Sequence, residues 1–347
     1  MPGSASTVAA RTLELVDIHS PSREEQEIAA YVTGEMPWEP TWRDAETLWY
    51  STGPGPPEVV FAGHLDTVPA NGNFPGSRSN GVVHGLGASD MKGGVAVMME
   101  LAWALADASG GPTTGFLFFP REEIAVEHSP LPAFFATGAL DGAGLVVVLE
   151  PTDNEIQLGC VGNVNARLRF EGKSAHTARP WLGVNAIDLA VERLARVAGL
   201  PPHEVEVGGL AFREVLSLTG ISGGRADNVV PDLVEATLNF RYAPNRSLDD
   251  AEARLHELAG DEIEIVSHSP AASVAVSNPL VRRLERIGAF ELTPKQAWTP
   301  VAQFAELGLD AVNFGPGATR YAHARDEQVE EAALERCLEA LRVLVTA

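Results

Sequence analysis

Residues 59–66 read Val-Val-Phe-Ala-Gly-His-Leu-Asp, an apolar run that ends in a histidine and a carboxylate. The run is short and rich in β-branched and aromatic residues, which predicts a buried strand that ends at His64. Side chains alternate along an extended chain, so His64 and Asp66 point the same way, and the carboxylate can orient an imidazole that binds a metal. Taken alone, such a pair is more typical of a hydrogen-bonded turn. Whether His64 is a metal ligand therefore depends on the residues that the rest of the chain brings to it.

Charged or metal-binding side chains follow other apolar runs as well. Behind the runs Gly115–Phe119, Gly144–Leu149 and Ala311–Phe314 come Glu122 and Glu123, Glu150, and His323. Runs that are apolar on both faces and separated by helices indicate a mostly parallel sheet covered by helices. Ligands of such sheets gather at the carboxyl ends of the strands, so we expect these side chains to converge. Asp90 lies between glycines that permit close backbone approach, although it also suits the N-cap of a helix over Lys92–Ala106.

Glu122 and Glu123 are adjacent carboxylates at a strand end, where they would repel each other unless a cation were present. One would bind the metal and the other would take a proton from water, whereas the alternative is a solvated loop. Together with the histidines, these residues predict a site for two divalent metals that share one carboxylate. Such a site activates water at neutral pH and polarises a carbonyl oxygen, which predicts a hydrolase.

The pattern changes from about Val161 onward. Apolar and polar residues alternate over Asn165–Phe170, Val215–Ile221 and Glu235–Tyr242. Alternation predicts strands with one wet face, as in an antiparallel sheet. Helices are predicted between them, over Asn185–Val197 and over Leu248–Leu258 with Ser247 as N-cap.

We therefore expect an α/β protein with two domains. The large metal-binding domain, with a mostly parallel central sheet covered by helices, comprises residues 1–161 and 275–347. A smaller α+β domain, residues 162–274, is inserted into it. The large domain is expected to contain a helix that the capping box Ser22-Arg-Glu-Glu25 opens and to close with a helix over Glu327–Val345.

Composition excludes several partners. The formal charge of −22, from 25 basic and 47 acidic residues, argues against nucleic acid and anionic membranes. No apolar run reaches the length of a membrane span, and the N-terminus lacks the features of a signal peptide. Cys160 and Cys337 are the only cysteines, which fits a reducing cytoplasm.

Further candidates lie in the inserted domain. His176 is not needed as a ligand if the set above is complete, so it is either an oxyanion donor or a polar loop residue. Arg179 follows it in the same segment, and we count it among the candidate substrate contacts. Asn228 and Arg241 carry amide and guanidinium groups that suit a carboxylate-bearing substrate. The chain has no Gly-x-Ser-x-Gly segment and no phosphate-binding loop.

At this point the chain resembles the M20 family of co-catalytic zinc hydrolases, and within it the actinobacterial succinyl-diaminopimelate desuccinylases. The resemblance runs nearly end to end. It is carried by Ala62-Gly-His-Leu-Asp-Thr-Val-Pro69, Ser89-Asp-Met-Lys-Gly-Gly94, Glu122-Glu123, Glu150-Pro-Thr152, Ser174-Ala-His-Thr-Ala-Arg179, Asp227-Asn-Val-Val-Pro231, Asn239-Phe-Arg-Tyr-Ala-Pro244, Val312-Asn-Phe-Gly-Pro-Gly317 and Ala322-His323.

The resemblance implies a ligand set for two zinc ions, with cobalt or manganese as alternatives. One ion would be bound by His64, Asp90 and Glu150, and the other by Asp90, Glu123 and His323, so that Asp90 bridges them. It also implies a cis peptide bond between Asp90 and Met91.

Other roles follow from the same resemblance. Asp66 would orient His64, and Glu122 would act as general base and then protonate the leaving amine. The inserted domain would form a homodimer and act as a lid, with His176 reaching the partner's active site as oxyanion donor. Asn228 and Arg241 would contact a small N-acyl amino acid.

The chain departs from the family in two places. After Trp298-Thr299 the family usually reads Asp-x-x-Arg-Phe, whereas this chain has Gln303 in place of the arginine. Conversely, Arg320 stands where relatives carry a small polar stretch. Both positions are therefore candidate substrate contacts. Because a positive charge is lost at one and gained at the other, the sequence leaves open which acyl group the substrate carries.

The expected reaction is removal of an N-acyl group from a carboxylate-bearing amino acid, with N-succinyl-L,L-diaminopimelate as the first candidate substrate. An acetylornithine-type deacetylase or a dipeptidase is the alternative within the class. A non-catalytic dimeric binding protein is the alternative outside it, although such copies usually lose ligands or the base, and here none is lost.

Overall fold

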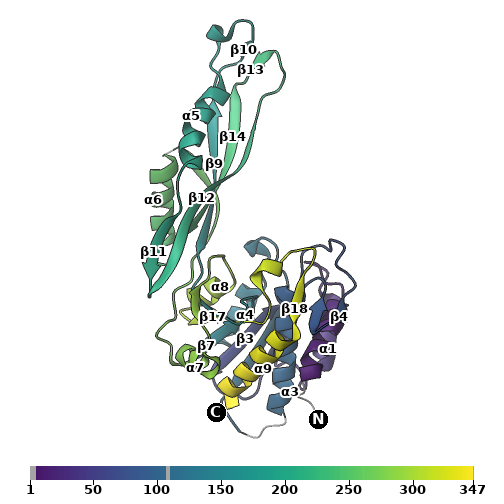
Figure 1. The fold of residues 1–347 in the computed structure, drawn as a ribbon. Coiled ribbons are helices and arrows are strands. Elements are labelled where there is room, and N and C mark those ends of the chain that lie inside the picture. Colours follow the sequence, from purple (N-terminus) through teal and green to yellow (C-terminus); the bar gives the residue numbers. More distant parts are fainter. Residues whose placement is uncertain (1–4, 107–109, 261, 347) are drawn as a thin grey trace. The chain divides into compact units, whose positions relative to one another are not determined.

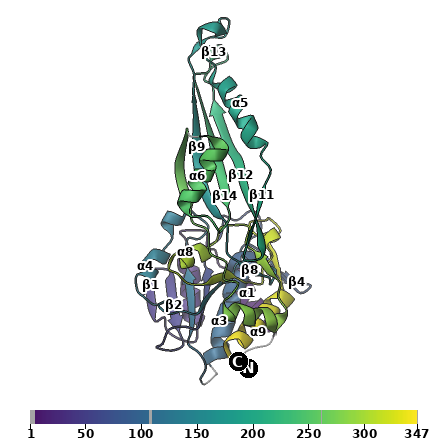
Figure 2. The same cartoon turned by 90° about the vertical axis from the view of Figure 1, so that its left-hand side faces the viewer.

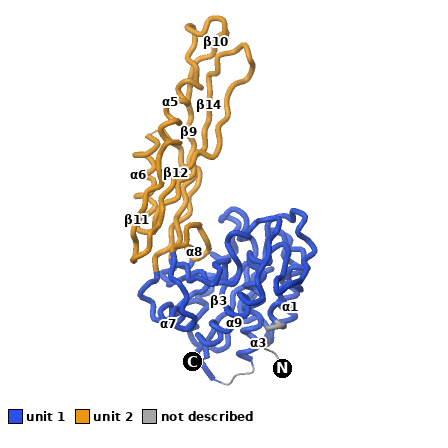
Figure 3. Tube along the Cα trace, viewed as in Figure 1, with its two compact units in different colours: residues 1–158, 275–293, 303–347 blue, residues 159–274, 294–302 orange. Residues whose placement is uncertain are grey.

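The computed structural model describes residues 5–106, 110–260 and 262–346 (Figure 1). They form two compact units (Figure 3). The larger takes in the chain up to Leu158, residues 275–293 and the chain from Gln303 on, and the smaller comprises 159–274 with 294–302. Residues 294–302, which the sequence places in the large domain, group with the smaller unit. There Gln296 donates to the backbone oxygen of Arg213 and Trp298 to that of Pro270.

The larger unit, which shares β16 and α8 with the smaller one, contains both helices and strands. They are α1 (Ala5–Val16), α2 (Gln26–Glu35), β1 (Trp42–Asp44), β2 (Thr47–Ser51), β3 (Val59–His64), β4 (Ser77–Ser79), β5 (Val82–His84), η1 (Ala88–Lys92), α3 (Gly93–Ala106), β6 (Thr114–Phe119), η2 (Val126–His128), α4 (Leu131–Phe135), β7 (Leu145–Val148), β8 (Ile156–Leu158), α7 (Pro279–Gly288), β16 (Leu292–Pro294), α8 (Val301–Glu306), β17 (Ala311–Asn313), η4 (Thr319–Tyr321), β18 (Gln328–Glu330) and α9 (Glu331–Thr346).

The central sheet of this unit has the strand order β1-β2-β6-β3-β7-β17-β8-β16. Its inner strands β6, β3, β7 and β17 are parallel, whereas β2 and β8 add to them in antiparallel fashion. Every residue of β3, β6 and β7 is buried, which explains why these runs are apolar on both faces. Helices α1, α3 and α9 pack together as one layer (Figure 1). The predicted α/β class with a mostly parallel sheet is confirmed.

Two local predictions in the larger unit are wrong. Glu25 occupies the N-cap of α2 but makes no side-chain cap, and the Ser22 hydroxyl donates to Asp66 instead. The final helix starts at Glu331, because residues 328–330 pair as β18 with β5. In both cases a partner distant in sequence offers a better hydrogen bond than the local helix does.

The smaller unit is built on an antiparallel sheet with the order β11-β12-β14-β9-β15. Its elements are β9 (Gly162–Glu171), β10 (Ala175–His176), η3 (Pro180–Leu182), α5 (Ala186–Ala198), β11 (His203–Val207), β12 (Leu210–Gly223), β13 (Val229–Val230), β14 (Leu233–Tyr242), α6 (Leu248–Ala259) and β15 (Ile263–Ser269). Ser247 caps α6 as predicted, in a capping box with Asp250. Helices α5 and α6 contact each other and bury their apolar sides against the sheet (Figure 2).

Among the described residues, no helix is long and apolar enough to cross a membrane.

Candidate metal centre

The carboxyl ends of neighbouring parallel strands bring the predicted residues to one edge of the sheet. His64, the last residue of β3, pairs with Phe119, the last residue of β6. Ala62 of β3 pairs with Val148, the last residue of β7. The side chains that follow β6 and β7 are Glu122, Glu123 and Glu150. This is the meeting point of strand ends that the alternation of apolar runs and helices predicts.

One cluster of donor atoms is formed by His64, Asp90 and Glu150. The Nε2 atom of His64 lies 3.2 Å from Asp90 Oδ1 and 4.0 Å from Glu150 Oε1. On the other side of the ring, Nδ1 lies 3.0 Å from the backbone oxygen of Asp66. A carbonyl oxygen only accepts, so Nδ1 carries a proton, and Nε2, which faces the cluster, is the atom that would bind a metal.

A second cluster is formed by Asp90, Glu123 and His323. The Nε2 atom of His323 lies 2.9 Å from Glu123 Oε2 and 3.5 Å from Asp90 Oδ2. In each cluster the donor atoms lie within 4.8 Å of one another. Asp90 thus presents Oδ1 to one cluster and Oδ2 to the other, which is the arrangement required of a bridging carboxylate. The peptide bond between Asp90 and Met91 is cis, as the resemblance implies.

The loop that carries His323 lies against the backbone of two other site segments. A Cβ atom on Gly315 would lie 2.4 Å from the backbone oxygen of Glu150, and one on Gly317 would lie 2.3 Å from that of Ser89. Only glycine allows this approach. His323 itself has a φ of 60°, in the left-handed region that non-glycine residues seldom occupy. The glycines therefore bring the loop, and with it His323, against the segments that carry Asp90 and Glu150.

The carboxylates of this centre lie so close together that a cation would stabilise them. Removal from water, together with the carboxylates of Glu150, Glu123 and Asp90, raises the pKa of Glu122 well above its usual range. The hydrogen bond to Glu123 raises the pKa of His323 to about 9. The four carboxylates of Asp90, Glu122, Glu123 and Glu150 would repel each other without positive charge between them. Imidazole nitrogens and carboxylate oxygens are ligands of zinc, so the donor set fits two such ions.

Asp66 is completely buried and accepts three hydrogen bonds with its carboxylate. The backbone N–H of Glu122 donates to Oδ1 at 2.9 Å, and that of Glu123 to Oδ2 at 3.1 Å. The Ser22 hydroxyl also donates to Oδ2, at 2.7 Å. By contrast, Oδ1 lies 3.6 Å from His64 Nδ1, beyond an ordinary hydrogen bond. The carboxylate thus holds the segment with the two glutamates, while the backbone oxygen of the same residue contacts His64.

Sequence reasoning overlooked two buried carboxylates that support the site. Glu25 accepts hydrogen bonds from the backbone N–H groups of Arg23 and Arg121, directly before Glu122. Glu327 accepts three from the segment that carries Asp90. Burial raises the pKa of Glu327 to about 7, although these N–H donors lower it. Local patterns mark both residues only as helix starts and not as parts of the site, because their partners lie far away in sequence.

The two residues that depart from the family pattern, Gln303 and Arg320, lie in the larger unit. Both bond to residues outside the two donor clusters. Gln303 is buried on α8, and its Nε2 lies 3.3 Å from the Ser129 hydroxyl. Arg320 is exposed and lies 3.2 Å from Asp153, with its guanidinium above the Tyr321 ring. Arg320 is therefore engaged by its own neighbours.

The other candidate substrate contacts belong to the smaller unit. His176 in β10 pairs with Val229 of β13, next to Asn228, whose backbone oxygen accepts from Thr177. The Nδ1 atom of His176 accepts from the backbone N–H of Ala178, so the neutral ring carries its proton on Nε2, ready to donate.

Arg179 and Arg241 differ in their surroundings. Arg179 is exposed at the start of η3. Arg241 is partly buried in β14, where its Nε donates to Asn239, and burial lowers the pKa of its guanidinium.

Comparison with known proteins agrees with this centre. The sequence pattern of the peptidase family M20/M25/M40 matches residues 60–347. The chain therefore belongs to this family and is a metal-dependent hydrolase that acts on amide bonds.

Two relatives with known names and one solved structure are similar to this chain over nearly its whole length. A Mycobacterium tuberculosis protein provisionally named succinyl-diaminopimelate desuccinylase DapE is 35% identical, over 95% of this chain and 96% of its own length. The succinyl-diaminopimelate desuccinylase of Corynebacterium glutamicum is 34% identical, over 91% of this chain and 90% of its own. Among solved structures, aminopeptidase PepT from Bacillus cereus superimposes with a TM-score of 0.79 at 22% identity, covering 99% of this chain and 98% of its own.

Proposed function

We propose that this chain is a di-zinc amidohydrolase that removes the acyl group from an N-acyl, carboxylate-bearing amino acid. The substrate we favour is N-succinyl-L,L-diaminopimelate, which would yield succinate and L,L-diaminopimelate for the biosynthesis of diaminopimelate and lysine. The single observation that carries the proposal is Asp90, whose two oxygens face two separate donor clusters. Two relatives that carry the desuccinylase name cover nine-tenths or more of this chain and support the choice of substrate.

Five side chains are the proposed metal ligands. His64, Asp90 and Glu150 would hold one zinc ion, and Asp90, Glu123 and His323 the other. When bound, the ions would polarise the acyl carbonyl and lower the pKa of water. Cobalt or manganese are alternatives that accept the same donors.

Glu122 is the proposed general base. Its carboxylate takes a proton from water as the oxygen attacks the acyl carbon. The carbon–nitrogen bond then breaks, and Glu122 returns the proton to the leaving amine, so one carboxylate serves both halves of the hydrolysis. Burial and neighbouring carboxylates raise its pKa, which suits a group that must both take up and release a proton.

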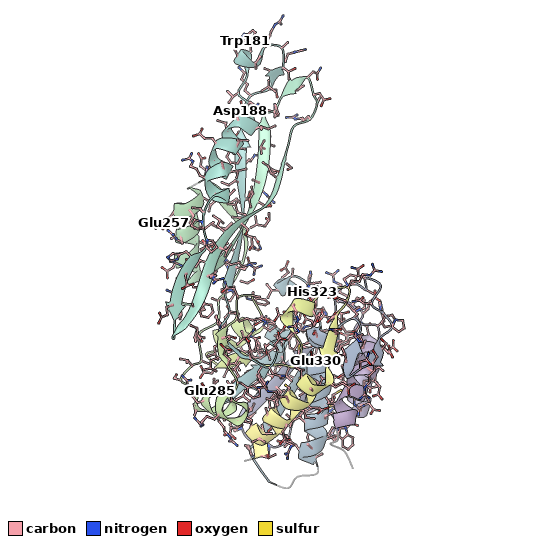
Figure 4. All side chains as sticks on the ribbon, in the orientation of Figure 1. Trp181, Asp188, Glu257, Glu285, His323 and Glu330 are labelled. Atoms are coloured by element: carbon pink, nitrogen blue, oxygen red, sulfur yellow. The ribbon has the colours of Figure 1, made fainter. Side chains whose placement is uncertain are left out.

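We propose residues 1–161 and 275–347 as the catalytic domain and residues 162–274 as a dimerisation and lid domain. Support comes from apolar side chains exposed on and before α5. Trp181, which Figure 4 labels, is 75% exposed. Leu182 is 59% and Val191 58% exposed. Such side chains are typical of a surface that a second copy covers.

A dimer would also explain where the polar candidates of this domain lie. Strand β14 begins at Leu233, close behind β13 and Asn228, and Arg241 lies near its other end. At about 3.3 Å per residue, the strand separates the two ends by about 25 Å. One small substrate therefore cannot contact His176 and Arg241 of the same chain. In the proposed dimer, His176 donates its Nε2 proton to the oxyanion in the partner's site.

We further propose that the protein acts in the cytoplasm. Cys160 and Cys337 are both free and buried, as expected of a protein kept in a reducing compartment.

The test is a steady-state comparison of acyl substrates with the zinc-loaded protein. N-succinyl-L,L-diaminopimelate is compared with N-acetyl and N-succinyl derivatives of ornithine, lysine and glutamate, and with dipeptides. We expect the highest kcat/KM for the first compound. A higher value for N-acetylornithine or a dipeptide would replace the substrate but keep the chemistry. Bound zinc without hydrolysis of any compound would favour a binding protein. Glu122→Gln serves as the inactive control.

A further inference from the structure

The segment that carries Asp90 and the segment that carries His323 are joined by a set of hydrogen bonds that the proposed chemistry does not use. At its centre is Glu327, which is only 2% exposed. Its Oε1 accepts from the backbone N–H groups of Ser89, at 3.1 Å, and Asp90, at 2.9 Å. Its Oε2 accepts from the backbone N–H of Gly87 at 2.9 Å.

The backbone around Gly87 is shaped to receive this carboxylate. Gly87 has a φ of 79°, in the left-handed region, which turns its N–H toward those of the residues that follow. Converging backbone N–H groups of this kind form a concave site for an anion. Here the anion is the side chain of Glu327, four residues after His323 in the chain.

Ser89 closes the connection from the other side. Its hydroxyl donates to the backbone oxygen of Gln328 at 2.7 Å and accepts from the backbone N–H of Ala318 at 3.0 Å. These two partners lie before and after His323 in the sequence. These hydrogen bonds thus connect the segment that carries Asp90, the proposed bridging ligand, to the chain on both sides of His323.

We propose that Glu327 is a positioning residue that sets Asp90 and His323 at the spacing required for two metals. It touches neither donor cluster with its carboxylate and acts through the backbone of Asp90. The inference rests on the proposed di-metal function, since it assigns a role within that centre. A carboxylate is needed because both of its oxygens accept hydrogen bonds, whereas an amide would turn an NH2 group toward a backbone N–H.

The experiment compares Glu327→Gln with Glu330→Gln, which removes the same charge from an exposed position three residues further on. Zinc affinity is measured by competition with a chelator, and kcat and KM are measured on the zinc-saturated proteins. We expect Glu327→Gln to bind zinc about 10- to 100-fold more weakly, as is usual when a group that supports ligands is removed. It should lower kcat with KM unchanged, and Glu330→Gln should behave as wild type.

Unchanged zinc affinity in Glu327→Gln, with a melting temperature lowered equally with and without zinc, would overturn the inference and leave a purely structural residue. Should Glu327→Gln fail to fold, Ser89→Ala removes the hydroxyl bridge alone and is expected to weaken zinc binding in the same direction. Wild-type zinc affinity in Ser89→Ala would then overturn the inference. Wild-type protein that binds no zinc at all would instead refute the proposed function, so the two failures are distinguishable.

Discussion

Replacing Asp66 with asparagine separates two roles that a single residue could play. The sequence suggests that the carboxylate orients His64. The structure instead shows the backbone oxygen of residue 66 beside His64 Nδ1, at 3.0 Å, and the carboxylate bonded to the backbone of Glu122 and Glu123. Asp66→Asn keeps the backbone oxygen and removes only one carboxylate oxygen. The variant should therefore disturb the proposed base while leaving His64 in place.

The magnitude follows from the donors. Asparagine offers one acceptor oxygen and one NH2 group. The Asp66 carboxylate accepts hydrogen bonds from two backbone N–H groups. In either orientation the NH2 group of asparagine faces one of them, so that N–H is left without a partner. A buried donor without a partner costs about 1–3 kcal/mol, a sizeable part of a typical total stability of about 5–15 kcal/mol. Because the segment with Glu122 then shifts, we expect kcat/KM to fall about 10- to 100-fold.

The assay combines kcat/KM for N-succinyl-L,L-diaminopimelate, zinc content under saturating zinc, and the free energy of unfolding in urea. We expect Asp66→Asn to keep two zinc ions while it loses activity. Asp250→Asn, which alters an exposed capping box in the smaller unit, is the control and should leave kcat/KM unchanged. Loss of zinc from the His64 cluster would refute the reasoning and restore the carboxylate as the group that orients His64.

Four further outcomes are expected. Glu122→Gln should retain zinc but lose at least about 100-fold in kcat, the scale of general-base loss, whereas Glu123→Gln should lose zinc; equal zinc content and activity in both would contradict these roles. Chelation should lower the melting temperature, because the carboxylates then repel each other. In the metal-free protein, His323 has its pKa raised to about 9 from about 6.5, so its stabilisation is full below pH 6.5 and is lost as the pH rises through 9; His323→Gln should flatten that slope in urea unfolding measured across pH. Gln303→Arg should raise kcat/KM for N-succinyl-L,L-diaminopimelate at least about 10-fold if its guanidinium pairs with a substrate carboxylate, and unchanged selectivity across the acyl panel would place residue 303 outside the substrate contacts.

The sequence predicts what depends on burial and period. Strand β3 is apolar up to His64 because it is covered on both faces, and β9 and β14 alternate because one face of their sheet is open. Since the carboxyl ends of parallel strands meet at one edge of a sheet, the sequence predicts that the residues behind β6 and β7 lie beside His64. This covers Glu123 and Glu150, whereas Asp90, which belongs to both clusters, lies in η1 and follows no strand of the central sheet.

What the sequence does not predict is which distant group each polar side chain meets. Ser22 and Glu25 match a capping box, yet Ser22 bonds to Asp66 and Glu25 to the backbone of Arg121. Glu327 fits the start of a helix by its pattern, yet it supports the backbone of Asp90. These partners are dozens to hundreds of residues apart, and local periodicity carries no information about them.

The central claim is that Asp90 joins two metal sites in one centre. X-ray diffraction from crystals of the zinc-loaded protein, recorded on both sides of the zinc absorption edge, tests it most directly. The account predicts two anomalous peaks in each chain, about 3.5–4 Å apart, the spacing of co-catalytic metal pairs. One peak should lie among His64, Asp90 and Glu150, and the other among Asp90, Glu123 and His323. A single peak, or two peaks that do not share Asp90, would contradict it.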